Sequence, residues 1–249
     1  MTPLDAAALV TIGAFAGAIN SVAGGGSLLT IPLLGAVGIA PVEANATNRI
    51  GVLMQAVTST AGFARAGALD TRDLAWLPGS VAGAALGAWI AASMEPRAFE
   101  TVVGIIFLFA GAALIRSILR AGRTDAPAPR PLPRWFVHIA MFGLGVYGGF
   151  VQAGAGVLIL LVLHVAGGQS LLRANAVKAA SIALWTVLAL GVFARAGLVH
   201  LAEGLVLGVG GMIGAHQGVR WAARVSQSRL RAALAVACVV AGVTMLADL

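Results

Sequence analysis

The sequence contains few charged residues. They make up 10% of its 249 residues, against about a quarter in a typical soluble domain. Hydrophobic residues reach 59%, and the mean hydropathy is +0.96. The charges that remain separate long apolar runs, a pattern that excludes an ordinary soluble domain. We therefore expect an all-α polytopic membrane protein that contacts the lipid bilayer.

Cysteine, metal-binding histidine patterns and acidic residues within the apolar runs are also scarce or absent, and each absence excludes a class of function. One cysteine, Cys238, excludes an internal disulfide. Four scattered histidines lack a metal-ligand spacing, and no P-loop is present, so we expect neither a metal site nor an ATPase. The apolar runs hold no Asp or Glu, which argues against a buried proton relay. The basic residues are scattered and only one tyrosine accompanies them, so we expect no nucleic-acid partner and no cofactor.

A long internal repeat organises the chain. Residues 23–67 align without a gap with residues 153–197, and 16 of these 45 positions are identical. Chance would give roughly 5 in so biased a composition. The repeat predicts one transmembrane domain made of two halves, about 1–118 and about 134–249, joined by an Arg/Pro-rich linker at about 119–133.

Each half begins with an apolar stretch that is too long for one helix. Between Asp5 and Glu43 lie 37 uncharged residues, which as a helix would measure about 55 Å against a hydrocarbon core of about 30 Å. Three glycines, 24–26, interrupt this stretch, and residues 154–156 interrupt its counterpart. We expect a broken-helix hairpin at each position, followed by three transmembrane helices.

The distribution of basic residues favours the hairpin over a single crossing. With hairpins, 13 of the 16 Arg and Lys residues share one side, and Arg49, Arg97 and Arg195 lie on the other; single crossings would divide them 8 to 8. The positive-inside rule selects the first arrangement. Five segments per half then make the two repeats inverted, with a cytoplasmic linker and both termini on the outer, periplasmic side of the inner membrane.

Two glycine patterns predict close helix packing. Gly79, Gly83 and Gly87 recur every fourth residue in the first half, and Gly210, Gly214 and Gly218 do so in the second. Small residues at this spacing allow another helix backbone to approach closely. We assign them to packing and not to ligand binding.

The polar residues around the two breaks are the candidate binding site. A helix interrupted inside a membrane leaves backbone groups that need protein, water or ligand, and a helix N-terminus suits an anion. Arg49 and Lys178 are expected a turn inside the membrane, with a small anion as partner. The candidate substrate-binding residues are Asn20, Ser21, Gly24, Gly25, Gly26, Ser27, Asn45, Asn48, Arg49, Gln152, Gly154, Gly156, Asn175, Lys178 and Ser181.

Structural roles for these residues remain open at this point. Arg49 and Lys178 can extend to the membrane interface, and the glycines can act only as hinges. Asn45 and Asn175 can cap helices or join them by hydrogen bonds.

The sequence resembles the sulfite exporter TauE/SafE family. The matching stretches are AINSVAGGGSLLTIPLLGAVGIAPVEANATN (18–48), its degenerate copy VQAGAGVLILLVLHVAGGQSLLRANAVKAAS (151–181), and GAALGAWIA (83–91). The resemblance implies an inner-membrane permease for sulfite, organosulfonates or related small anions. It also implies that Gly24–Gly26, Asn45, Gly154–Gly156 and Asn175 lie near the pathway. Ala155 and Val157 replace Gly25 and Ser27, so the second break has less polar lining.

These observations lead to a permease or exporter of a small sulfur-containing anion that works by alternating access around the paired breaks. A permease for a carboxylate or a metal ion is the alternative, and a non-transporting membrane assembly protein is a third reading. An enzyme would need a base to activate Ser27, and no second motif supplies one, so we expect no enzymatic activity. The sequence leaves a homo-oligomer open.

Overall fold

The structure is a computed structural model, and the residues it describes form helices joined by short turns. These residues are 2–22, 25–120 and 132–221, with 236, 239–240, 242–243 and 246–247. The first half contains α1 (Pro3–Val22), α2 (Ser27–Ala36), α3 (Pro41–Arg65), η1 (Thr71–Trp76), α4 (Leu77–Ser93) and α5 (Pro96–Arg120). The second half contains α6 (Arg134–Phe150), α7 (Ala155–Leu160), the π-helix η2 (Leu161–Ala166), α8 (Leu171–Arg195) and α9 (Leu201–Trp221).

The expected all-α fold is confirmed. The first break lies between α1 and α2, as expected, whereas the second lies at 151–154, slightly before the expected 154–156, because residues 155 and 156 belong to α7. The return segments differ from each other. The first is a regular helix, α2, whereas the second is a six-residue helix that continues as a π-helix. After α3 the chain forms the 3₁₀ helix η1 before α4 begins. Most of the linker at 119–133 and most of residues 222–249 lie outside the described residues.

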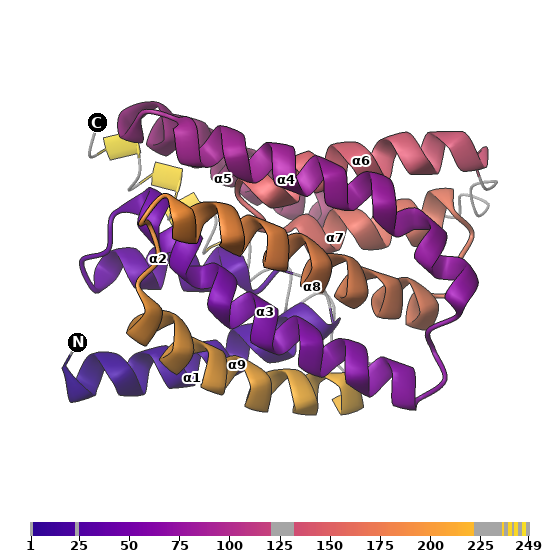
Figure 1. Ribbon diagram of the computed structural model, residues 1–249, viewed down its shortest axis with the longest axis horizontal. Coiled ribbons are helices and arrows are strands. Elements are labelled where there is room, and N and C mark those ends of the chain that lie inside the picture. The colour runs from indigo at the N-terminus through magenta and orange to yellow at the C-terminus, as the bar shows by residue number, and fades with distance from the viewer. Residues whose placement is uncertain are drawn as a thin grey trace.

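Two glycine-lined helix pairs join the halves. In the first, a Cβ on Gly210, Gly214 or Gly218 of α9 would collide with the α1 backbone at Val10, Ala14 or Ala18. The constant spacing of these contacts shows that α1 and α9 run parallel. Figure 1 shows them side by side along the lower edge of the molecule.

The second pair, α4 and α6, has the same construction. A Cβ on Gly83 or Gly87 would collide with the carbonyl of Phe142 or Val146, and a Cβ on Gly149 with that of Ala84. The expected packing role therefore holds for these glycines, because only glycine permits so close an approach. Gly79 is the exception: within the described part of the chain, a Cβ there would meet open space.

The long helices α3 and α8 lie between these pairs and run side by side through the middle of the view (Figure 1). Each has 25 residues, a length of about 37 Å. The start of α3 meets the turn after α8, and the start of α8 meets the segment after α3, so the two helices are antiparallel. Both bury polar residues in the protein interior, and these become the site described below.

The outer surface is apolar. Large exposed side chains include Phe15, Trp89, Phe109, Ile139 and Ile213, each more than half exposed. Such a surface is unusual for a soluble monomer and typical of contact with lipid. By length and hydropathy alone, two of the described helices would span a membrane, Pro3–Ser21 and Leu171–Arg195. α3 is less apolar because its polar residues face the interior of the protein.

Candidate functional site

Arg49 of α3 binds the end of the broken helix in the other half. Its Nη1 donates to the carbonyl of Gly148 at 2.6 Å, and its Nη2 donates to the carbonyls of Gly149 and Phe150 at 2.7 and 3.3 Å. Nη1 also donates to Gln152 Oε1 at 2.8 Å. The last carbonyls of a helix lack partners within the helix and carry its negative dipole end. A fully buried guanidinium therefore completes the C-terminus of α6.

Lys178 of α8 makes the corresponding contact in the opposite direction. Its Nζ donates to the carbonyls of Asn20 and Ser21, at 2.8 and 3.3 Å, near the end of α1. Its third partner is Asn175 Oδ1, at 2.7 Å. Each half thus supplies a buried cation that binds the broken helix of the other half. Neither base extends to an interface, so that structural alternative is wrong.

A small pocket opens beside the first break. It lies between α1, α3 and α8, and its empty volume is about 260 Å³ including the solvent at its mouth. It is lined by Asn20, Val52, Gln55, Ala56, Ser59, Lys178, Ala179 and Ile182. Asn20 and Lys178 were expected here, whereas Gln55 and Ser59 were missed. The sequence did contain a signal for them: both are polar, and their spacing of four residues within an uncharged helical run places them on one face of the helix.

A hydrogen-bond network connects this pocket to the break. Gly26 N–H donates to Asn20 Oδ1 at 2.6 Å, and Asn20 Nδ2 donates to Gln55 Oε1 at 2.5 Å. The hydroxyls of Ser21 and Ser59 lie 2.7 Å apart. Gly26 cannot be replaced, because a Cβ would collide with the carbonyl of Ala16 and with the Asn20 side chain. The first break is therefore held by Asn20, which joins α1, the start of α2, and α3.

The second break is closed by aromatic packing. Trp185 of α8 is fully buried against Gly148, where an added Cβ would lie 2.5 Å from the indole ring. Its Nε1 donates to Ser80 Oγ at 2.9 Å. Gln152 donates to Thr186 Oγ1 at 3.0 Å and adopts a positive φ of 60°, while Gly154 adopts 73°. The left-handed backbone at Gly154 explains the need for glycine there.

The remaining candidates divide into two groups. Asn45 donates to the carbonyl of Phe150 at 2.9 Å, and Asn48 accepts from Thr30 at 2.5 Å, so both join elements around the breaks. Ser181 instead donates to Val177 of its own helix.

The glycines and the serine of the breaks complete the set. Gly25, Ser27 and Gly156 are buried. Gly24 lies outside the described residues. The two breaks are neighbours, since a Cβ on Gly154 would lie 3.8 Å from Leu28 Cδ1.

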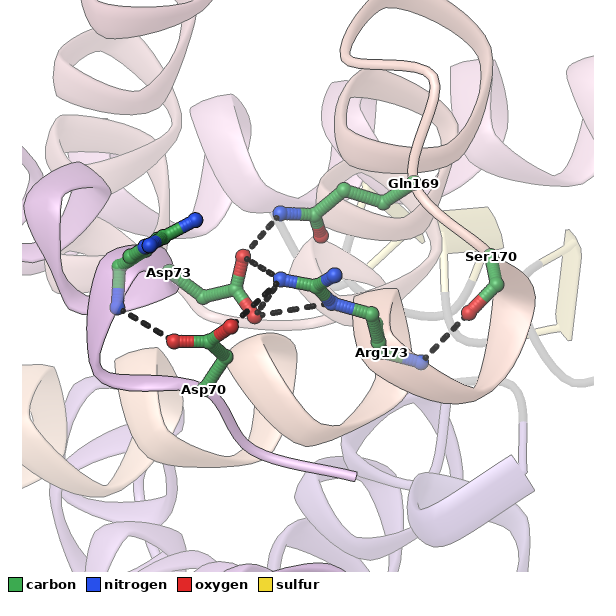
Figure 2. Close-up of polar contacts among 6 residues, drawn as sticks. Asp70, Asp73, Gln169, Ser170 and Arg173 are labelled. Carbon is green, nitrogen blue, oxygen red and sulfur yellow. Dashed lines mark hydrogen bonds and ion pairs between the residues drawn. The ribbon is translucent and has the colours of Figure 1, made fainter. Parts of the chain in front are cut away.

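Polar clusters hold both ends of the α3–α8 pair. At one end, Arg173 binds both carboxylate oxygens of Asp73, with a shortest distance of 2.9 Å, and Gln169 donates to Asp73 at 2.9 Å (Figure 2). At the other end, His200 Nε2 lies 2.8 Å from Glu43 Oε2. Among the described residues, the ion pairs lie at these ends and not beside Arg49 or Lys178.

Comparison with known proteins identifies the family. The sulfite exporter TauE/SafE family model matches residues 9–245, nearly the whole chain. This chain belongs to the sulfite exporter TauE/SafE family. The resemblance seen in its glycine-rich stretches is thereby confirmed.

Relatives of this TauE/SafE protein are named as transporters. The probable membrane transporter protein ORF9 of Sinorhizobium sp is 30% identical over 244 residues, which cover 97% of this chain and 92% of the relative. The probable membrane transporter protein YfcA of Escherichia coli K12 is 29% identical over 256 residues, covering 100% and 92%. A probable membrane transporter protein of Haemophilus influenzae is 27% identical over 218 residues, covering 86% and 84%. No solved structure matches the chain significantly.

The family and these relatives establish the class of the protein. It is a membrane permease and not an enzyme, it works in a lipid environment, and its substrate is a small molecule.

Proposed function

We propose that this TauE/SafE protein is a permease for a small sulfur-containing anion, sulfite or an organosulfonate. One observation carries the proposal: two fully buried bases, Arg49 and Lys178, lie at the breaks and bind helix carbonyls. Among the described residues, neither base forms an ion pair with a carboxylate. Their positive charge is therefore available to an anion. The same charge disfavours the alternative of a metal cation. A small carboxylate fits the same chemistry and is the second candidate.

The membrane potential is sufficient to drive export in this proposal. Export of an anion from a negative-inside cell releases about 2.3 kcal/mol of free energy per charge per 100 mV. The substrate would reach the pocket from alternate sides as the elements around the two breaks rearrange. The inverted topology belongs to the same proposal and is supported by the antiparallel α3 and α8. The location of both termini on the outer side of the inner membrane rests on the positive-inside rule.

Flux into proteoliposomes tests the substrate. Purified protein is reconstituted, and uptake of labelled sulfite is compared with that of acetate at an imposed inside-positive potential and with that of Ni²⁺ at an inside-negative potential. We expect sulfite uptake above that of protein-free vesicles, increasing with the potential. Uptake of acetate or Ni²⁺ without sulfite would overturn the substrate assignment and leave the permease class intact.

Thiol labelling tests the topology. In a Cys238→Ala background, single cysteines replace Thr2 or Leu132, which precede α1 and α6 respectively. An impermeant maleimide should label Thr2→Cys in intact cells and Leu132→Cys only after permeabilisation. The reverse pattern contradicts the proposed orientation.

A further inference from the structure

We propose that the pocket beside the first break is the protein's single anion site, and that the Gln55 side-chain amide is its direct oxygen ligand. The inference rests on the proposed anion permease function and adds the site, its stoichiometry and a ligand residue. The pocket contains one charged group, Lys178, and the polar groups of Asn20, Gln55 and Ser59. The other lining residues are apolar, so the polar groups determine where an oxyanion sits.

The hydrogen-bond network fixes the orientation of the Gln55 amide. The backbone N–H of Gly26 can only donate, so the atom of Asn20 that receives it is the oxygen. The Asn20 nitrogen must then be the donor to Gln55, and the Gln55 atom that it reaches is the oxygen. The Gln55 NH₂ group therefore faces away from Asn20.

This NH₂ group needs a partner. Gln55 is 2% exposed, and in the part of the chain that the structure describes its Nε2 has no hydrogen-bond acceptor. A buried donor without a partner costs about 1–3 kcal/mol. Gln55 lines the pocket, and a Cβ on Gly211 of α9 would lie 3.2 Å from its Nε2, so an oxyanion that reaches the α9 side of Gln55 supplies the missing acceptor.

Lys178 contributes charge and not a direct bond. An ammonium group has three N–H donors, and all three have partners on α1 and on Asn175. The positive charge stays beside the pocket in a buried environment, where it acts strongly on a nearby anion. The site thus combines one free neutral donor with one fixed charge.

The position equivalent to Gln55 in the second half carries no free amide donor. A shift of 130 residues takes Gln55 to Trp185 and Asn20 to Phe150. The Trp185 ring fills the space against Gly148, and its N–H is already bonded to Ser80. Within the part of the chain that the structure describes, the second half thus lacks an equivalent of the Gln55 site, and we expect one anion per chain.

Isothermal titration of the purified protein in detergent with sulfite, and separately with methanesulfonate, tests this site. We expect one anion per chain. Gln55→Leu and the equal-sized Gln55→Glu should each weaken binding about 10- to 100-fold, because a hydrogen bond to a charged group is lost and, in Gln55→Glu, a like charge is added. The matched control is Trp185→Phe at the equivalent position, which should leave the affinity within about 2-fold.

Gln55→Glu keeps the oxygen that accepts from Asn20, so unchanged elution and melting temperature without ligand show that it folds. Unchanged anion affinity in a folded Gln55→Glu, or two anions per chain, would overturn the inference while sulfite flux upholds the permease. Absence of sulfite binding and flux in the wild type would instead overturn the proposed function. Binding of methanesulfonate but not sulfite keeps the site and assigns it to organosulfonates.

Discussion

The two breaks share one design and differ in their lining. At both, a base from the other half binds the carbonyls near the end of a broken helix. Around the first break the neighbouring positions are Asn20, Ser21, Gln55 and Ser59, and around the second the equivalent positions are Phe150, Val151, Trp185 and Ala189. The difference teaches that the base–carbonyl contact is structural in both halves, whereas the polar lining that can hold a ligand belongs to one.

Removing the Arg49 side chain should cause the largest loss of stability, because the contact between a base and helix carbonyls occurs at both breaks and is fully buried. Arg49→Met leaves the carbonyls of Gly148 and Gly149 buried without their donor. We expect a loss of about 3–5 kcal/mol in stability, measured by thermal unfolding in detergent. Arg49→Lys, which keeps the charge but not the planar fork, should recover part of it. Wild-type stability in Arg49→Met would show that the contact is dispensable.

A smaller effect should follow from adding a methyl group at the second break. Gly148→Ala places a Cβ 2.5 Å from the Trp185 ring and should cost about 1–3 kcal/mol through overpacking. The equivalent residue of the first half is Ala18, and the smaller Gln55 stands at the position of Trp185. Adding Trp185→Phe, which removes the colliding ring atoms, should restore most of the loss in a double-mutant cycle. Additive losses would mean that the ring does not limit this position.

The smallest effects are expected at the polar clusters that hold the ends of α3 and α8. Asp73 is 4% exposed and takes a two-oxygen contact from Arg173, so Asp73→Asn should cost about 1–2 kcal/mol. Glu43 and His200 are more exposed, with side chains 35% and 42% accessible, so Glu43→Gln should cost at most about 1 kcal/mol. Chemical denaturation of both variants measures the difference. A larger loss for Glu43→Gln would reverse the ranking.

The sequence predicts the helical class and the approximate position of both breaks, because charge, glycine and hydropathy are local signals. It does not predict the partners of Arg49 and Lys178, because Arg49 and Gly148 are 99 residues apart and meet only through tertiary packing. Ser181 shows the same limit: it shares a helix face with Lys178 but bonds to its own backbone. Gln55 and Ser59 were missed because they lie further along α3 than Asn45, Asn48 and Arg49, and only tertiary packing brings them beside the first break.

The glycine-lined pairs have a consequence for how the protein is made. α1 closes against α9, and α4 closes against α6, so both first-half helices find their partners in the second half. During synthesis the first half must remain in the bilayer with α4 uncovered until α6 ends at Phe150, and with α1 uncovered until α9 ends at Trp221. The two halves therefore complete their packing together, after the second half has been inserted, and neither half can reach its final structure alone.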